Sequence, residues 1–223
     1  MMMNIARFQF NPIAENTYVV WDGTGEAAII DAGNYAAKED KTLSEFIAEK
    51  GLKPVLAVNT HGHFDHLLGV NYLKDTYGVP FALSSDDRFL LDAMGPSAYV
   101  YGMQLGEMPS VDIDLKGRGE IKFGNTTLEI IPVPGHTPGH VALFEPGSRV
   151  VFTGDTLFAD SIGRTDLPGG DYSWIMKSIL ENLLPLGGDV RVYPGHGPDT
   201  TIAHEAANNP FIVEVIDGDV NYK

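Results

Sequence analysis

Four side chains able to bind a metal ion lie within a six-residue stretch of this chain, HGHFDH, which begins at His61. The stretch follows an apolar run, Val55–Asn59, that predicts a strand. His61 and His63 are two residues apart, so both imidazoles of an extended loop can converge on one ion. Asp65 and His66 follow on an expected first helical turn, where the helix dipole favours a carboxylate. Two neighbouring pairs of ligands are what a two-metal centre requires.

Three further segments place a histidine or an aspartate directly after a predicted strand, on a turn that contains glycine. These side chains are His136 after Thr127–Val133, Asp155 after Val150–Thr153 and His196 after Val190–Tyr193. Glycine at such turns lets the backbone come close to an ion. The alternative is a solvated histidine loop without metal, which requires the same coincidence at four places in the chain. We therefore predict that all of these side chains serve one metal centre.

The elements that must position these side chains follow from the pattern of apolar runs. Short β-branched runs between turn residues predict strands at Thr17–Trp21, Ala27–Ile30, Val55–Asn59, Thr127–Val133, Val141–Phe144 and Val150–Thr153. Helices are predicted at Glu39–Lys50, Asp65–Tyr77 and Tyr172–Leu184, the last with Asp171 as its N-cap. Residues 86–105 are expected to be partly helical, with a break at Gly95-Pro96. Their large apolar side chains are expected either to wall a pocket, to form a lid, or to pack onto the domain or against a second subunit; they are Phe89, Met94, Tyr99, Tyr101 and Met103. This order predicts an α/β fold in which two sheets pack together under helices.

The composition limits the class of protein. The 223 residues are 43% hydrophobic and 20% charged, which fits one α/β domain spanning residues 1–223. There is no cysteine, so any metal must be held by imidazole and carboxylate, donors that suit zinc, iron or manganese. A formal charge of −15 disfavours nucleic acid as a partner. Without a signal peptide or an apolar stretch of roughly 18 residues, we expect a cytoplasmic protein that does not span a membrane. The oligomeric state is not predicted.

The order HxHxDH, a later His, a later Asp and a final His resembles the metallo-β-lactamase superfamily over almost the whole chain. The resemblance implies a four-layer αββα sandwich with the site at one edge of the sheets. It also implies that one divalent cation is held by His61, His63 and His136 and a second by Asp65, His66 and His196, with Asp155 bridging them. Zinc is the expected metal, with iron or manganese as alternatives. Such cations lower the pKa of water from about 15.7 to roughly 7, so a hydroxide is expected to attack a carbonyl while Asp65 accepts a proton.

Longer motifs narrow the resemblance to the glyoxalase II group, the hydroxyacylglutathione hydrolases. They are THGHFDH, PGHTPGH, FTGDTLF, GRTDLPGGD and PGHGPDTT, together with Asn16-Thr17-Tyr18 and Ile30-Asp31-Ala32-Gly33. The resemblance implies hydrolysis of a small-molecule acyl thioester such as S-lactoylglutathione. Full-length members carry a C-terminal helical domain with basic contacts to glutathione, whereas this chain ends with an acidic tail soon after Phe211. It is therefore similar to the short, single-domain bacterial relatives, and the thiol carrier stays open.

Two other functions fit the same residues. Persulfide dioxygenases share the short layout and the segment from Gly163 to Asp166, but they use one iron; a two-metal content without oxygen uptake would favour the hydrolase. A non-catalytic metal-binding or sensing protein is the second alternative, although diiron electron carriers of this fold have Glu where His63 stands and add a flavin domain. β-Lactam hydrolysis is disfavoured, because true β-lactamases lack the Ser161–Asp171 segment in this form.

Three weaker features complete the prediction. Arg164 is a candidate to bind a substrate carboxylate, since its planar guanidinium suits that geometry; the alternative is an ion pair with Asp166 that stabilises a turn. His140 either reaches the metal site from a second layer or forms a structural hydrogen bond at the start of a strand. His204 is expected on the surface of a helix.

Overall fold

The computed structural model describes residues 3–103, 105–216 and 218, and within them the main strands form two six-stranded sheets. The first sheet has the order β1-β2-β3-β4-β5-β6, with strands Asn4–Phe10, Glu15–Trp21, Glu26–Ile30, Lys53–Val58, Phe81–Leu83 and Ile113–Asp114. The first three strands are antiparallel, and β3 to β6 are parallel. The second sheet has the order β14-β13-β10-β9-β8-β7, with strands Thr200–Thr201, Arg191–Pro194, Val150–Gly154, Val141–Glu145, Thr126–Pro132 and Glu120–Phe123. A small hairpin pairs β11 (Leu157–Phe158) with β12 (Ser161–Ile162).

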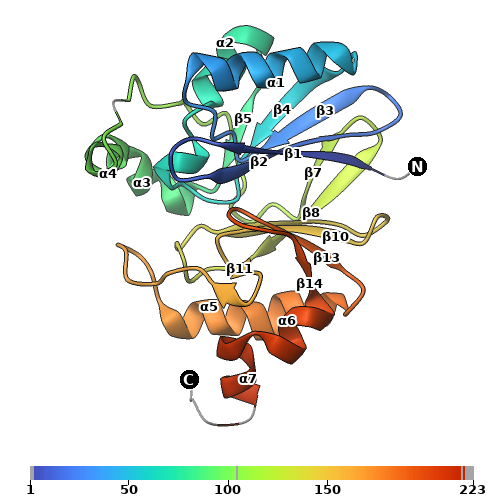
Figure 1. Ribbon diagram of the computed structural model, residues 1–223, viewed down its shortest axis with the longest axis vertical. Helices are drawn as coiled ribbons and strands as arrows, with labels where there is room; N and C mark the ends of the chain where they lie inside the picture. The colour runs from blue at the N-terminus through green and yellow to red at the C-terminus, as the bar shows by residue number, and fades with distance from the viewer. Residues whose placement is uncertain (1–2, 104, 217, 219–223) are drawn as a thin grey trace.

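Helices cover the outer face of each sheet, which gives four layers (Figure 1). Helices α1 (Ala37–Glu49) and α2 (Val70–Tyr77) lie on the first sheet. Helices α5 (Tyr172–Ser178) and α6 (Ile202–Asn208) lie on the second, and α7 (Pro210–Ile216) packs against α6 on the side away from the sheet. The short helices α3 (Arg88–Asp92) and α4 (Met94–Val100) stand to one side of the layers. The predicted αββα sandwich is therefore confirmed.

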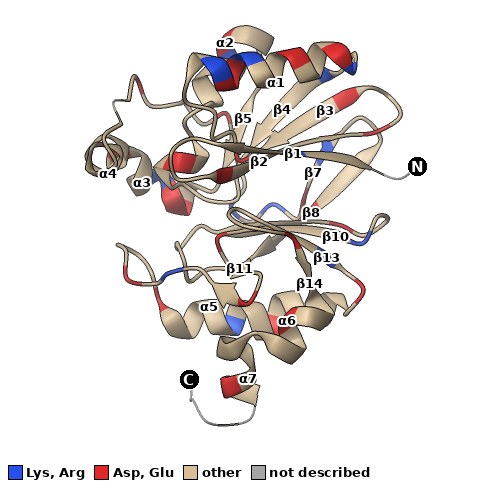
Figure 2. Cartoon of the chain, in the orientation of Figure 1, with Lys and Arg blue, Asp and Glu red and all other residues tan. Residues whose placement is uncertain are grey.

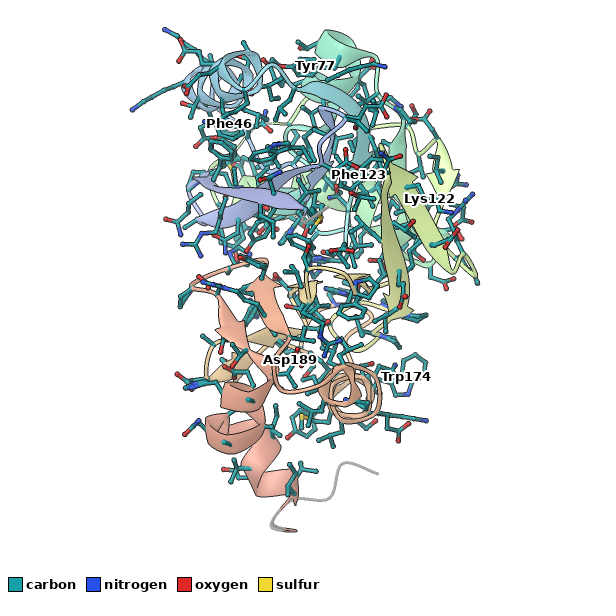
Figure 3. The ribbon with its side chains drawn as sticks, turned by 90° about the vertical axis from the view of Figure 1, so that its right-hand side faces the viewer. Phe46, Tyr77, Lys122, Phe123, Trp174 and Asp189 are labelled. Atoms are coloured by element: carbon teal, nitrogen blue, oxygen red, sulfur yellow. The ribbon has the colours of Figure 1, made fainter. Side chains whose placement is uncertain are left out.

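The alternation of side chains along each strand divides the apolar residues among three cores. On β2, Tyr18 points to the core between the sheets, while Val19 points to the core beneath α1. On β7, Phe123 points inward and Lys122 points to solvent (Figure 3). Phe46 of α1 faces the first sheet, where its ring packs edge-on against Phe8 and Trp21.

The predicted helix over Asp65–Tyr77 is wrong at its start. Residues Phe64–His66 form a single 3-10 turn, and α2 begins only at Val70. The backbone here bonds to groups outside the expected helix: the side-chain amide of Asn59 donates to the carbonyl of His66 at 2.6 Å, and the Gly69 N–H donates to the carbonyl of Ala32 at 2.7 Å. These long-range bonds take up groups that a continuous helix would use internally.

Two other helix predictions need smaller corrections. α-Helical geometry over Tyr172–Leu184 ends at Ser178 and is followed by a π turn, Ile179–Leu183, and a 3-10 turn, Leu184–Leu186. Asp171 is the N-cap, as predicted, because its carboxylate accepts from the N–H of Trp174 at 2.9 Å. The break predicted at Gly95-Pro96 lies earlier, at Ala93, and Pro96 sits in the first turn of α4, where a missing N–H costs no helical bond. Across the described part of the chain, no helix is both long and apolar enough to cross a membrane.

Asp22 joins the two sheets at one end and makes the stability of the fold depend on pH. Its carboxylate accepts bonds from the N–H and hydroxyl of Thr24, the N–H of Asn125 and the hydroxyl of Thr126. Burial alone would raise its pKa, but these donors lower the pKa to about 2. The ionised carboxylate therefore adds stability above its unfolded pKa near 4, and this stability is lost as pH falls toward 2.

We expect Asp22→Asn to lower the free energy of unfolding by about 2 kcal/mol at pH 7. The difference from the unmodified protein should shrink steadily between pH 4 and pH 2, because protonated Asp22 then resembles the amide. Urea unfolding of both proteins between pH 7 and pH 2 measures this difference in the free energy of unfolding. A difference that stays constant with pH would show that the charge of Asp22 is not what stabilises this junction.

Candidate metal centre

The first group of ligands joins a loop from each sheet. His61 and His63 follow β4 of the first sheet, and His136 follows β8 of the second. Nδ1 of His63 lies 2.8 Å from Nε2 of His136, and one ring nitrogen from each of the three imidazoles lies within 4.8 Å of the others. The three side chains thus converge on one point, as the sequence predicted for the first two.

The second group lies beside the first and is also built from both sheets. Asp65 and His66 belong to the 3-10 turn after the first group, and His196 follows β13. Oδ2 of Asp65 lies 3.2 Å from Nε2 of His196 and 3.6 Å from Nε2 of His66. These three atoms could also surround one ion.

Asp155 stands between the two groups. Its Oδ2 lies 3.6 Å from Nε2 of His136 in the first group and 3.6 Å from Nε2 of His196 in the second. Its Oδ1 lies 3.5 Å from Nε2 of His66. Gly195 must be glycine for this approach, because a Cβ there would lie 2.2 Å from Oδ1 of Asp155. The structure therefore brings all seven predicted ligand residues together, with one carboxylate shared between two ligand groups.

The polar atoms at this centre fit a pair of cations. Nε2 of His61, Nε2 of His66 and Oδ1 of Asp155 are buried and have no hydrogen-bond partner. Burying such atoms unpaired is costly, and a pair of bound cations would satisfy all three. Imidazole and carboxylate together are a donor set for zinc or iron.

In three of the imidazole rings, Nδ1 faces a polar group of the surrounding protein, and Nε2 is left free. The hydroxyl of Thr60 donates to Asp31 at 2.8 Å, so it accepts from Nδ1 of His61 at 3.0 Å. Nδ1 of His136 donates to the carbonyl of Arg164 at 2.7 Å, and Nδ1 of His66 faces Oδ2 of Asp31 at 3.2 Å. Each ring therefore presents Nε2 to the centre, which is the usual arrangement around ligating histidines.

Asp31 and Glu15 also lie behind the imidazoles, and neither was predicted to belong to the site. Asp31 accepts from both the N–H and the hydroxyl of Thr60 and adopts a positive φ of 51° just after β3. Oε1 of Glu15 lies 3.9 Å from Nδ1 of His66, and burial raises the pKa of Glu15 well above its usual range. The position of Asp31 directly after an apolar strand, like that of the proposed ligands, could have indicated a place in the site. No pattern in the sequence indicates Glu15.

The charges around the two groups differ. Burial and neighbouring imidazoles lower the pKa of His61, and they lower that of His63 to about 4, so both rings are neutral at pH 7 and able to bind a metal. Burial lowers the pKa of His66, but Asp65 and Asp155 outweigh it and raise that pKa well above its usual range. Burial raises the pKa of Asp155, but His66 and other imidazoles outweigh it and hold that pKa well below its usual range. The same carboxylates that favour a proton on His66 favour a metal cation in its place.

His140 lies at the start of a strand and forms a structural hydrogen bond, and His204 lies on the surface of a helix, as predicted. His140 precedes β9, and its Nε2 accepts from the N–H of Asp155 at 3.0 Å while its ring stacks on His61. It thereby holds the backbone of the shared carboxylate in place. His204 lies on α6, half-exposed, with Nε2 2.8 Å from Oδ1 of Asp160.

A cavity of about 720 Å³ opens above the centre. His63, Asp65, His136, Asp155 and His196 form its floor, whereas His61 and His66 are fully buried beneath. Of the residues predicted to wall a pocket or pack, Phe89 and Tyr101 line this cavity, while Met94 and Met103 pack into the core under the first sheet. Arg164 also lines it, but its guanidinium makes two 2.7 Å bonds to the carboxylate of Asp166.

Asp87 ties the loops that carry the first group of residues to the cavity wall, and no pattern in the sequence indicates this role. Its Oδ2 accepts from the N–H of Gly62 at 2.9 Å and from the hydroxyl of Thr137 at 2.7 Å, while Oδ1 accepts from the N–H of Gly139 at 2.7 Å. Gly62 lies between two ligands of the first group, and Thr137 follows the third. Asp87 also directly precedes α3, which carries Phe89 of the wall. We infer that Asp87 is a positioning residue for the first ligand group.

We expect Asp87→Asn to weaken metal binding about 10- to 100-fold, the range typical of residues that orient ligands. An amide retains one acceptor oxygen for three donors, so at least one loop N–H loses its partner. Competition with a chromogenic chelator measures the affinity, and unfolding of the metal-free proteins measures the purely structural cost. Asp86→Asn is the matched control, because Asp86 is exposed and paired with Lys116. Equal affinities for Asp87→Asn and the control would refute the positioning role.

Comparison with known proteins agrees with the fold. Residues 11–196 match the family model of the metallo-beta-lactamase superfamily, and the chain belongs to that superfamily. It is 39% identical over 217 residues to the hydroxyacylglutathione hydrolase GloC of Haemophilus influenzae, covering 94% of this chain and 98% of that protein. The crystal structure of the BLEG-1 B3 metallo-beta-lactamase superposes with a TM-score of 0.86 at 34% identity, covering 95% of this chain and 99% of the other. TTHA1623 in a di-iron-bound form superposes with a TM-score of 0.82 at 37% identity, covering 92% and 99%.

Proposed function

We propose that the protein is a metal-dependent hydrolase that cleaves acyl thioesters, as glyoxalase II enzymes do. The observation that carries the proposal is the pair of ligand groups sharing Asp155 at the floor of an open cavity. The similarity to GloC along almost the whole of both chains supports the thioester as substrate. The charge of −15 is in keeping with a small molecule and not a nucleic acid.

Each ligand group has a defined part in this proposal. His61, His63 and His136 would hold one divalent cation, Asp65, His66 and His196 the other, and Asp155 would contact both. When bound, such cations ionise water near neutral pH and polarise a carbonyl oxygen. Asp65 lies on the cavity floor, where its carboxylate can accept the proton that the attacking water loses and return it to the thiolate sulfur as the C–S bond breaks. His140, Asp31 and Thr60 hold the ligands in place and do not face the cavity.

Hydrolysis of S-lactoylglutathione and of short acyl thioesters by the purified protein tests this proposal. We expect turnover by metal-replete protein, its loss with a chelator and its return when zinc is added. Thiol release at the same rate with and without bound metal would contradict the proposal, as would no turnover of any thioester by fully loaded protein.

The same preparation separates the alternatives. We propose zinc as the metal, and the di-iron form of TTHA1623 makes iron the competitor that elemental analysis must address. A persulfide dioxygenase would hold one iron per chain and consume oxygen with glutathione persulfide, whereas the hydrolase would hold two ions and consume none. The similarity to BLEG-1 favours β-lactam hydrolysis as a second candidate, so a β-lactam belongs in the assay. Faster turnover of the lactam than of every thioester would make β-lactam hydrolysis the first candidate and thioester hydrolysis the second.

A further inference from the structure

The walls of the cavity differ in character from its floor. Above the histidines and aspartates, the walls are mainly apolar, with a few polar side chains at Ser97, Ser161 and Arg164. The apolar side chains come from separate parts of the chain, namely Ile13, Phe64, Phe89, Leu90, Phe158 and Ile162. Ile13 comes from the β1–β2 turn, Phe89 from α3, and Phe158 from the small hairpin. A substrate whose carbonyl reaches the floor must therefore place its remaining atoms against apolar walls.

Arg164 is the one lysine or arginine among the described residues that line the cavity. Its guanidinium is already paired in fork geometry with both carboxylate oxygens of Asp166. A carrier with several carboxylates, such as glutathione, would find here a single guanidinium, which is exposed and already shared with Asp166. It would leave its other charges unpaired against apolar walls, which is costly.

The apolar wall continues outward onto the surface. Phe89, Val100 and Tyr101 line the cavity and yet remain 42%, 79% and 52% exposed. Helix α4, which ends at Val100, has no charged residue, and Figure 2 shows it wholly tan. Adjacent exposed apolar side chains at the mouth of a cavity are typical of a ligand-binding surface.

The cavity and its rim together indicate the chemical class of the substrate. We propose that the thioester taken by this site carries an uncharged, apolar group several carbon atoms long, which lies against Phe89, Val100 and Tyr101. This inference rests on the proposed thioester hydrolysis and narrows its substrate. The apolar group belongs either to the acyl part or to the thiol part, and both present the same chemistry to the wall.

Two series of thioesters test this proposal and distinguish the two sources. One extends the acyl group from acetyl to octanoyl on N-acetylcysteamine, and the other keeps acetyl and extends an alkyl thiol. Metal-replete protein should show kcat/KM rising roughly threefold per methylene in one series, as expected for burial of apolar surface. S-Lactoylglutathione should be at least tenfold poorer than the best member. Flat dependence in both series with S-lactoylglutathione as the best substrate would overturn the proposal while leaving thioester hydrolysis intact. No turnover of any thioester would overturn both.

Variants at the rim test the same point without altering the metal ligands. Val100→Lys should raise kcat/KM for S-lactoylglutathione and lower it for the octanoyl ester, because it adds a cation where an apolar group would lie. Val100 is largely exposed at the end of α4, so a lysine there is compatible with the fold. Tyr99→Lys is the matched control: Tyr99 is 77% exposed on the same helix and does not line the cavity. Equal effects of the two variants on both substrates would show that the rim does not contact the substrate.

Discussion

Asp155→Asn is expected to lower kcat/KM for thioester hydrolysis by on the order of a thousandfold and to lower the bound metal of both ligand groups. Asp155 is the one ligand side chain whose carboxylate lies within 3.6 Å of imidazoles from both groups. An amide there removes the negative charge that both cations would share, and it turns an N–H₂ donor toward at least one of them. Activity assays together with elemental analysis of dialysed protein measure the two effects.

The matched control for this prediction is Asp160→Asn. Asp160 lies five residues further along the chain and also contacts an imidazole, that of His204, but on the exposed face of the molecule. We expect this variant to keep both its metal content and its activity. If Asp155→Asn retained two ions per chain and a near-normal rate, Asp155 would not be a shared ligand.

Asp65→Asn is expected to separate the two ligand groups. Its Oδ2 contacts His196 and His66 of the second group, whereas the first group consists of imidazoles. The variant should therefore keep the cation of the first group, lose most of the second, and lower kcat at least a hundredfold. The loss of rate combines a missing cation with a missing proton acceptor on the cavity floor.

Excess metal distinguishes these two causes. If Asp65 acts only as a ligand, saturating zinc should restore most of the rate; if it also accepts a proton, kcat should remain low at full occupancy. Asp92→Asn, at the exposed end of α3, serves as the control. Loss of both ions from Asp65→Asn would contradict the assignment of His61, His63 and His136 as an independent group.

The convergence of the seven proposed ligand residues could be predicted because most of them carry a local signal. His61, His136, Asp155 and His196 all follow apolar runs that the structure shows as β4, β8, β10 and β13. Chain reversal at strand ends brings polar residues to one edge of the sandwich, so the local pattern already contained most of the arrangement. The central strands were predictable for the same reason, since burial on both faces requires unbroken apolar runs.

The unpredicted parts depend on contacts between distant residues. Asp87 bonds to Gly62 across 25 positions and to Thr137 across 50, and nothing near it in sequence indicates either partner. The helix predicted to begin at Asp65 is wrong for a similar reason, because Asn59 and Ala32 form hydrogen bonds with the backbone there. Short strands such as β5, β6 and β14 have two or three residues, too few for a period to show.

Both ligand groups combine side chains from the first sheet with side chains from the second. His61, His63, Asp65 and His66 come from the first half of the chain, and His136, Asp155 and His196 come from the second. Metal binding would therefore hold the two sheets together at this edge, and loaded protein should unfold at a higher temperature than stripped protein.

Anomalous diffraction from crystals of metal-replete protein tests the central claim most directly. We expect two peaks, one about 2.0–2.2 Å from nitrogens of His61, His63 and His136 and the other at similar distances from Asp65, His66 and His196, with Asp155 in contact with both. A fully loaded crystal that showed no peak at this edge of the sheets, or showed these side chains directed away from one another, would contradict it.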